Sequence, residues 1–338
     1  QTEERQRRER EREEAMERMT RGRVCVTGAG GFTASWLVKL LLCKGYTVHG
    51  TVRDPSDEKN AHLKRLENAT ENLLLFKADL LDYASLCAAI AGCEGVFHTA
   101  CPVPPGKVAN PETEMIPPAL NGTLNVLKAC YEAKVRRVVV VSSVAAVCMN
   151  PNIPHDKIMD EDCWSDKEFC KATENWYCFS KTIAEEKALE YAKETGLDCV
   201  TVCPSLNLGP MLQPTVNASS LFLIKTLRGE RESMKNGVNY IVDVRDVADA
   251  LVLLYEKREA NGRYICSPHS IKTCDFIDKL KSIYPNFKEP QISIEVEPDA
   301  KLSSEKLKQL GWNYKTLEDT IIDSVEYFVK VHLLKENA

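Results

Sequence analysis

Short runs of β-branched and apolar residues alternate with longer stretches of helical periodicity between Arg23 and about residue 205. Six runs have strand character: RVCVTG (23–28), YTVHGTVR (46–53), LLLFKADL (73–80), GVFHTA (95–100), RRVVVVSS (136–143) and DCVTVCPS (198–205). Nearly continuous apolar runs of this length are typical of parallel strands that are covered on both faces. The pattern therefore predicts an α/β fold built on a doubly wound parallel sheet.

The pattern becomes irregular after about residue 205, where Pro204, Pro210 and Pro214 stand close together. One further strand-like run, VNYIVDV, is followed by a helical stretch, ADALVLLYEKRE. A smaller mixed region then continues to the end, which indicates a C-terminal substrate lobe joined to the first domain. The predicted division is a charged tail at 1–20, a nucleotide-binding domain at 21–205 plus about 237–258, and a substrate lobe at about 206–236 and 259–330.

The N-terminal segment QTEERQRRERERE mixes arginine with glutamate and contains no apolar stretch. Neither a secretory signal nor an acid-poor transit peptide has this composition. We expect a solvated tail that is disordered or helical.

Composition narrows the class of partner. The 338 residues carry 44 Lys plus Arg against 49 Asp plus Glu, a formal charge of −5, so no global basic field favours nucleic acid or an anionic membrane. Apolar runs such as VVVVSSVAAV are too short to cross a bilayer. We expect a small-molecule partner, no nucleic acid and no membrane, with monomer and dimer both open.

The 14 cysteines form no C-x-x-C pair and no Cys/His cluster with metal-ligand spacing. We therefore expect no metal site and no disulfide framework. A reducing, cytoplasmic setting fits this distribution best.

A glycine-rich turn follows the first predicted strand in TGAGGFTASWLVKLLL. Gly28, Gly30 and Gly31 lie between Thr27 and Phe32, where a helix begins. Bare backbone at a helix N-terminus lets a pyrophosphate approach closely, so these five residues are predicted to contact a dinucleotide. The alternative is a tight turn that serves packing alone.

The end of the second predicted strand bears on the choice of dinucleotide. The run TVRDPSDEK has Arg53 directly after the strand and Lys59 six residues later. Cations at this position favour a 2′-phosphate and hence NADP(H). Asp54, directly after Arg53, is instead the kind of residue that binds the ribose 2′-hydroxyl of NAD(H). The alternative is a pair of solvated surface charges.

A candidate catalytic group lies in ENWYCFSK, where Tyr177 and Lys181 share one face of a predicted helix. A nearby ammonium favours the phenolate of a tyrosine, an acid that is otherwise weak at neutral pH. Ser142 and Ser143 end the fifth predicted strand, at the sheet edge where ligands bind. Each feature alone has a structural explanation, because Y-x-x-x-K arises by chance and Ser-Ser often caps a helix. Their order favours Tyr177 as a general acid that Lys181 assists.

Together these segments resemble an extended short-chain dehydrogenase/reductase, a Rossmann-fold class. TVRDPSDEKNAHL, KADLLDY, FHTACPV, ENWYCFSKTIAEE and SEKLKQLGWNYKTLED resemble the plant cinnamoyl-CoA reductase family in particular. That family also contains short-chain enzymes of the cinnamyl alcohol dehydrogenase type and is related to dihydroflavonol reductases. The resemblance extends from residue 21 to about 330.

The resemblance implies specific roles. The catalytic triad falls on Ser143, Tyr177 and Lys181, and the glycine motif on Gly28, Gly31 and Ala34. Positions implied to touch NADP(H) elsewhere are Arg53 and Lys59 at the 2′-phosphate, Asp79 and Leu80 at adenine, Thr99 and Ala100 along the dinucleotide, Lys181 at the ribose and Pro204 at the nicotinamide. Positions expected in the substrate pocket are Val144, Phe222 and Lys225.

The sequence departs from the family where a CoA handle is expected. Thioester reductases resemble one another in an H-x-x-K after the N-A-S segment and in a later arginine. In NASSLFLIK the lysine is Lys225, but Phe222 takes the histidine position, and Thr273 in SPHSIKTCD takes the arginine position. Phe222 either packs in a core or lines an aromatic pocket. In both cases a free aldehyde suits the site better than a CoA thioester.

The expected reaction is NADPH-dependent reduction of a hydroxycinnamaldehyde, such as coniferaldehyde, to a cinnamyl alcohol in phenylpropanoid and lignin metabolism. Alternatives are a cinnamoyl-CoA reductase, a dihydroflavonol-type reductase and an NADPH-sensing scaffold without chemistry. Cys170 and Cys178 flank the segment leading into Tyr177; a disulfide switch and two free thiols are both open, with free thiols expected in a reducing cell.

Overall fold

The structure, a computed structural model, describes residues 21–101, 110–154, 157–293 and 301–335. The charged tail predicted at 1–20 lies outside the described residues.

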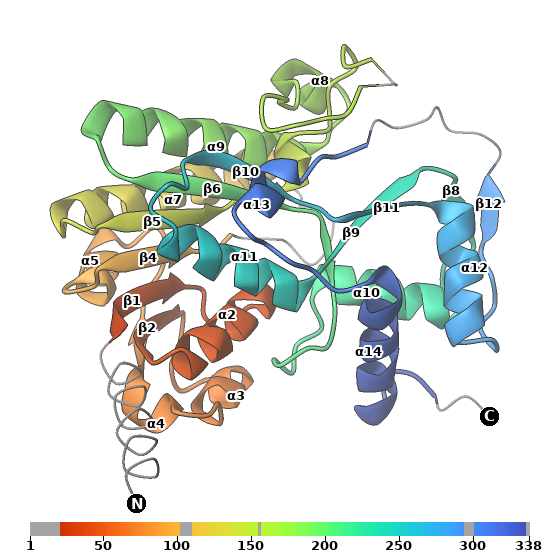
Figure 1. The fold of residues 1–338 in the computed structure, drawn as a ribbon, viewed down its shortest axis with the longest axis horizontal. Helices are drawn as coiled ribbons and strands as arrows, with labels where there is room; N and C mark the ends of the chain where they lie inside the picture. The colour runs from red at the N-terminus through yellow and green to blue at the C-terminus, as the bar shows by residue number, and fades with distance from the viewer. Residues whose placement is uncertain (1–20, 102–109, 155–156, 294–300, 336–338) are drawn as a thin grey trace, which may run out of the picture.

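A seven-stranded sheet forms the centre of the molecule, with the strand order β10-β6-β5-β4-β1-β2-β3 (Figure 1). All neighbouring strands in it run parallel. Its strands are β1 (Arg21–Thr27), β2 (Tyr46–Val52), β3 (Leu73–Lys77), β4 (Gly95–His98), β5 (Arg137–Val141), β6 (Cys199–Pro204) and β10 (Gly262–Cys266). The six predicted strands are confirmed as β1 to β6, and so is the doubly wound parallel architecture.

Helices cover both faces of this sheet because successive side chains of each strand point to opposite faces. On β1, Val24 and Val26 belong to one hydrophobic core, whereas Cys25 belongs to another. Helices α2 (Phe32–Cys43) and α11 (Val244–Glu256) contribute to the first core. Helices α5 (Tyr83–Ile90), α7 (Ile116–Glu132) and α9 (Trp176–Thr195) contribute to the second.

The strand order reverses direction between β1 and β4. The chain proceeds from β1 to β2 and β3 on one side, and then returns to add β4, β5 and β6 on the other. The connection after β1 therefore runs to one side of the sheet and the connection after β4 runs to the other. Open α/β sheets bind ligands at the carboxyl edge beside such a point. This reversal positions the candidate site.

A smaller lobe lies beside the sheet. It contains a three-stranded sheet of β7 (Leu206–Leu208), β9 (Val238–Asp243) and β11 (His269–Lys272), and a two-stranded sheet of β8 (Ser233–Lys235) and β12 (Gln291–Ser293). Helices α10 (Ala218–Leu227), α12 (Thr273–Ile283) and α14 (Leu317–Lys330) enclose a separate core with these strands. The remaining elements are η1 (Glu58–Asn60), α3 (Ala61–Lys64), α4 (Ala69–Asn72), α6 (Pro111–Glu114), η2 (Val144–Ala146), α8 (Lys167–Ala172) and α13 (Glu305–Gln309).

The predicted division into domains assigns two strands to the wrong sheet. The strand expected to return to the first domain, β9, pairs with β7 and β11 in the smaller lobe. The seventh strand of the large sheet is β10, within the range assigned to the substrate lobe. Hydrophobic runs predict that a strand is buried, but its pairing partner is far away in sequence, so the pattern does not reveal which sheet it joins. The domain boundaries themselves stay predictions.

Asp246 is a buried carboxylate where α11 meets the C-terminal segment. Its side chain accepts a hydrogen bond from the Lys315 backbone N–H at 2.8 Å, and its backbone carbonyl accepts one from Trp312 Nε1 at 2.9 Å. Burial, with smaller contributions from Asp243 and Asp249, raises the pKa of Asp246 to about 6. The folded protein thus binds this proton more tightly than the unfolded chain does.

We expect Asp246→Asn to raise the free energy of unfolding at pH 8 by roughly 1–3 kcal/mol, since the amide oxygen still accepts from Lys315 without carrying charge. The wild-type penalty develops as pH rises from about 4 to about 6, so the advantage of the variant should vanish near pH 4. Urea unfolding at several pH values measures this. Asp278→Asn, on an exposed position of α12, is the control. An advantage for Asp246→Asn that does not change with pH would contradict the assignment.

Candidate active site

The glycine-rich turn is held against β2 and the loop that follows β4. Gly28 has a φ of +67°, and its N–H donates to Thr51 Oγ1 at 3.0 Å. A Cβ atom at Gly28 would come within 3.0 Å of the Ala100 Cβ. The turn therefore requires glycine both for its left-handed backbone and for its close contact with Ala100.

Gly30 faces a buried amide. A Cβ atom there would collide with Oδ1 of Asn60, whose Nδ2 donates to the Asp54 carbonyl at 2.8 Å. Gly31 is the N-cap residue of α2, and its N–H donates to the Gly28 carbonyl at 2.9 Å. Together the glycines leave bare backbone at the start of a helix, as a pyrophosphate site requires.

Phe32 and Ala34 lie in the first turn of α2, and both are buried. The Phe32 ring packs in the core of the smaller lobe with Leu208 and Met211. Phe32 thus joins the two lobes through its side chain, and only its backbone remains suited to contact a phosphate.

The two predicted 2′-phosphate cations are both exposed near the end of β2. Arg53 follows the strand directly, and Lys59 lies in η1, where its Nζ is 2.6 Å from Asp57 Oδ2. Exposed pairs of this kind are weak, because water and salt screen them. A phosphate could therefore compete with Asp57 for Lys59.

The predicted adenine and dinucleotide residues lie at the carboxyl ends of β3 and β4. Asp79 is exposed, and its carboxylate accepts from the Leu81 N–H at 2.9 Å. Leu80 is half-buried, and Thr99 donates to the Thr27 carbonyl. The Ala100 N–H donates to Thr27 Oγ1 at 3.1 Å. The structure thus brings Thr27, Thr99 and Ala100 together beside the glycine turn.

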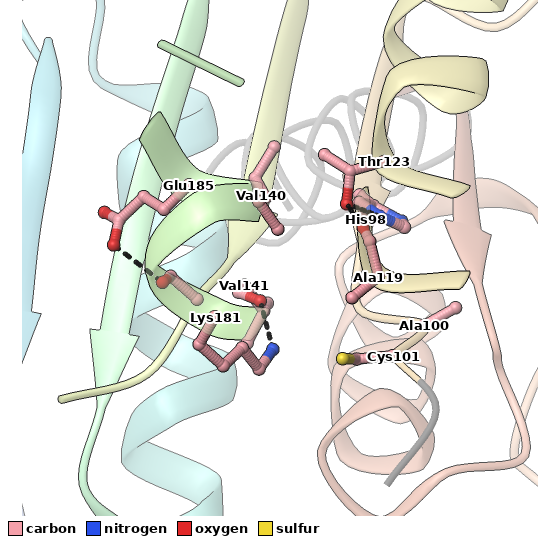
Figure 2. Close-up of a pocket in the computed structure, with 11 residues that line it drawn as sticks. His98, Ala100, Cys101, Ala119, Thr123, Val140, Val141, Lys181 and Glu185 are labelled. Carbon is pink, nitrogen blue, oxygen red and sulfur yellow. Dashed lines mark hydrogen bonds between the residues drawn. The ribbon is translucent and has the colours of Figure 1, made fainter. Parts of the chain in front are cut away.

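A cavity of about 20 Å³, room for about one water molecule, lies at the carboxyl ends of β4 and β5 (Figure 2). Its lining residues are His98, Ala100, Cys101, Ala119, Thr123, Val140, Val141, Ser142, Lys181, Ala184 and Glu185. Cys101 and Lys181 face each other across it. The cavity therefore lies between the loop that follows β4, which carries Ala100 and Cys101, and the helix that carries Lys181.

Lys181 is buried, and its Nζ donates to the Val141 carbonyl at 3.2 Å. Burial disfavours the ammonium, but the neighbouring Cys101, Tyr177 and Glu185 favour it more strongly, so the pKa of Lys181 lies above its ordinary value. Lys181 therefore remains a cation at neutral pH, which is the form that the predicted role requires.

Tyr177 lies one helical turn before Lys181. Helix α9 begins after Asn175, whose side chain accepts from the Cys178 N–H at 3.4 Å, and it ends at Gly196 with a φ of +75°. These caps fix the helix so that Tyr177 falls in its first turn and Lys181 in its second. Tyr177 is half-buried, packed near Ala145, Cys170 and Phe179.

Ser143 is the second residue after β5 and caps η2, where its Oγ accepts from the Ala145 N–H at 3.2 Å. This bond uses the oxygen as an acceptor and leaves the hydroxyl proton for another partner. Ser142 is instead buried, and its hydroxyl donates to Glu185. Of the two serines, Ser143 is the one suited to contact a ligand.

The other predicted positions are more dispersed. Pro204 is the last residue of β6 and is buried, and Val144 packs against a small core around Val147 and Met159. The Phe222 ring stacks on Phe276 at 6.5 Å between centroids, whereas Lys225 on the same helix is exposed. Core packing, one of the two alternatives for Phe222, therefore describes its surroundings. Its role in a substrate pocket stays a prediction.

Sequence patterns did not reveal His98 or Glu185 as components of this region. His98 is buried between Thr27 Oγ1 (2.9 Å) and Thr123 Oγ1 (3.2 Å). Burial, together with the Lys181 cation, lowers the pKa of His98 to about 3, so the ring is neutral. The available signals were weak: His98 ends the fourth strand, and Glu185 lies two helical turns after Tyr177.

Cys170 and Cys178 are both free thiols in the structure. Burial raises the pKa of both thiols, that of Cys178 to about 12. Within the described ranges there is no group of three His, Cys, Asp or Glu residues placed to hold a metal ion. No helix in the same ranges is long and apolar enough to span a membrane.

Comparison with known proteins gives one family match, one closely similar relative and two similar solved structures. Residues 24–266 match the profile of the NAD dependent epimerase/dehydratase family. Cinnamoyl-CoA reductase 1 of Petunia hybrida is 50% identical over 307 residues, which are 90% of this chain and 91% of that protein.

Two solved structures are also similar. Vestitone reductase from alfalfa has a TM-score of 0.82 at 33% identity, and the match covers 93% of this chain and 100% of that chain. Yeast methylglyoxal/isovaleraldehyde reductase, solved complexed with NADPH, has a TM-score of 0.80 at 27% identity, covering 92% of this chain and 99% of that chain. These likenesses agree with the observed Rossmann fold of the extended short-chain reductase type.

We expect Gly30→Ala to weaken binding of NADPH by at least about tenfold, because a Cβ atom at this turn hinders the close approach of the pyrophosphate to the backbone. Titration of nicotinamide fluorescence measures the affinity. Asn60→Ala and the double variant separate two causes. If the double variant regained wild-type affinity, the collision with Asn60 alone would explain the defect, and the predicted phosphate contact at Gly30 would be wrong.

Proposed function

The chain belongs to the NAD dependent epimerase/dehydratase family and to its branch of plant cinnamoyl-CoA reductases and their relatives, and we propose that it reduces hydroxycinnamaldehydes to cinnamyl alcohols with NADPH. One observation supports a reductase above all. A buried, cationic Lys181 lies one turn after Tyr177 and faces Cys101, in the loop that follows β4, across a cavity the size of one water molecule.

The site fits a dinucleotide because its turn has no room for side chains at Gly28 and Gly30. Thr27, Gly28, Gly31 and Ala100 would hold the cofactor's phosphates and adjoining sugar. Arg53 and Lys59 would favour a 2′-phosphate, and hence NADP(H) over NAD(H). When bound, the cofactor supplies a hydride to the carbonyl carbon.

Side chains of the protein bind the substrate's carbonyl oxygen and supply the proton that it takes up. The Ser143 hydroxyl donates a hydrogen bond to the substrate oxygen and keeps its proton, which stabilises the negative charge that develops there. Tyr177 then protonates that oxygen as a general acid. Lys181 stabilises the tyrosinate that remains, since its ammonium is held nearby in a buried setting.

A free aldehyde is favoured over a thioester by the residues at the expected CoA positions. Phe222 directs its ring toward Phe276 in the smaller lobe. Thr273, at the arginine position, is buried, and its hydroxyl donates to the Gly237 carbonyl at 3.1 Å. Neither residue offers a cation for a CoA phosphate, so recognition of that handle lacks two expected groups.

Cinnamoyl-CoA reduction is the second candidate, and two observations favour it. The Petunia protein of that name is 50% identical to this chain. In addition, the Arg231 guanidinium lies 4.8 Å from the Phe222 ring centroid, and Lys225 is exposed on the same helix as Phe222. These two cations could bind phosphate in place of the missing histidine and arginine.

A dihydroflavonol-type reductase and an NADPH-sensing scaffold rank lower. The first would need room for a fused flavonoid ring system. The second has no need of a tyrosine and a buried lysine one turn apart. The cysteine distribution, with Cys170 and Cys178 both free thiols, suits the cytosol.

We expect Tyr177→Phe to lower kcat for aldehyde reduction by about 10²–10⁴-fold, because the general acid is removed while the ring remains. NADPH affinity should stay within about threefold, since packing of the ring is preserved. Tyr191→Phe, farther along α9 and partly buried, is the matched control and should retain wild-type kcat. Full activity of Tyr177→Phe would overturn the mechanism.

We expect NADPH oxidation with coniferaldehyde to exceed that with feruloyl-CoA by at least about tenfold in kcat/KM, because two of the expected CoA contacts are missing. Parallel absorbance assays measure both, and NADH in place of NADPH tests cofactor choice. Faster turnover of the thioester would support the second candidate. In that case Arg231→Ala should impair the thioester reaction and leave aldehyde reduction unchanged.

A further inference from the structure

A carboxylate and a guanidinium that the proposed chemistry does not use lie buried behind the catalytic pair. The Glu185 side chain has no exposed surface, and the Arg263 side chain is 6% exposed. Arg263 Nε donates to Glu185 Oε1 at 2.9 Å, and its Nη2 donates to Oε2 at 3.2 Å. The two planar groups thus form a bidentate pair.

Glu185 also accepts hydrogen bonds from a residue directly after β5 and from a residue within β6. Ser142 Oγ donates to Oε2 at 2.7 Å, and Thr201 Oγ1 donates to Oε1 at 2.6 Å. Ser142 follows β5, Thr201 lies in β6, and Arg263 comes from β10. One carboxylate on α9 therefore fixes the helix to three neighbouring segments of the sheet.

Arg263 extends these contacts to the loops above the sheet. Its Nη1 donates to the Glu161 carbonyl at 2.9 Å and to the Cys163 carbonyl at 2.8 Å. Its Nη2 reaches the Ala146 carbonyl at 3.5 Å, and the guanidinium lies 3.5 Å from the Trp164 ring centroid. Ala146 belongs to η2, the turn that Ser143 caps.

Helical geometry connects this pair with the proposed chemistry. Glu185 follows Lys181 by four residues and Tyr177 by eight, so all three lie along one side of α9. Lys181 bonds the Val141 carbonyl, and Glu185 bonds Ser142. Figure 2 shows both side chains leaving the same helix, with Lys181 directed toward the cavity. Consecutive residues before Ser143 are thus held by consecutive turns of the helix that carries Tyr177.

We propose that Glu185 and Arg263 are positioning residues that hold Ser143, Tyr177 and Lys181 in register for hydride and proton transfer. The inference rests on the proposed function. A buried ion pair is rarely needed for stability, since apolar residues of similar volume often serve as well. Directional bonds to Ser142, Thr201 and Ala146 supply what an apolar contact lacks, a fixed geometry.

The first test is Glu185→Gln, with Glu186→Gln as the matched control. Glu186 is the next residue of α9, and it pairs with Lys167 at the surface. We expect Glu185→Gln to lower kcat by about 10–100-fold, as a displacement of about 1 Å in a reacting group does, with NADPH affinity within about threefold. Glu186→Gln should match the wild type in both. Unchanged kcat in a folded Glu185→Gln protein would overturn the proposal.

The double variant Glu185→Leu/Arg263→Met separates positioning from stability. An apolar pair should restore thermal stability to near that of the wild type and leave kcat lowered by at least about tenfold. Recovery of stability and kcat together would mean that the ion pair only supports the fold, and the inference would be wrong. This design also covers the case in which Glu185→Gln does not fold.

Hydrogen exchange in the double variant gives a reading independent of turnover. We expect faster exchange at residues 143–147 and 177–181, and unchanged exchange in β1 and β2. Exchange that is equally faster in all segments, or unchanged at residues 143–147 and 177–181, would contradict local positioning. A wild-type protein inactive on both aldehyde and thioester would overturn the proposed function instead, and the exchange pattern would then decide the inference alone.

Discussion

Burial of both faces of the parallel sheet is the constraint on which the rest of the structure depends. Strands such as β1 place successive side chains in two different cores, so helices must cover each face. Fully burying one Val or Leu side chain contributes about 1.5–3 kcal/mol. Parallel strands also require each connection to cross over the sheet, usually as a helix. The placement of α2, α5, α7, α9 and α11 on the two faces of the sheet follows from these requirements.

The location of the candidate active site follows from the same arrangement. All carboxyl ends of the strands meet at one edge, and the reversal between β1 and β4 separates two loops there. The glycine turn after β1 and Thr99 after β4 meet through Thr27. Helix α9 brings Tyr177 and Lys181 to this edge because it packs across β5 and β6. The candidate site is thus formed by segments that are far apart in sequence but meet at the same edge of the sheet.

Polar groups buried in this frame are costly unless they are fully paired. Removing one partner of a buried ion pair typically costs about 3–5 kcal/mol, so Glu185 and Arg263 each depend on the other. Asp246 is less fully compensated. Its carboxylate accepts a hydrogen bond from the Lys315 backbone N–H, and its raised pKa reflects the free energy that burying the charged form still costs. The buried groups of Glu185 and Arg263 therefore satisfy each other by hydrogen bonds. The buried Asp246 carboxylate, at the junction with the C-terminal segment, instead makes the free energy of unfolding depend on pH.

The sequence by itself determined the six strands, the glycine turn, the pairing of Tyr177 with Lys181 and the family, because all of these depend on local periodicity and short spacing. Only the tertiary structure decided that β10 completes the large sheet and β9 does not, since strand pairing is a non-local choice. It also decided the surroundings of Phe222, and it joined Glu185 to Arg263 across 78 residues. Burial and partnership depend on which segments meet in space, and no spacing along the chain specifies that.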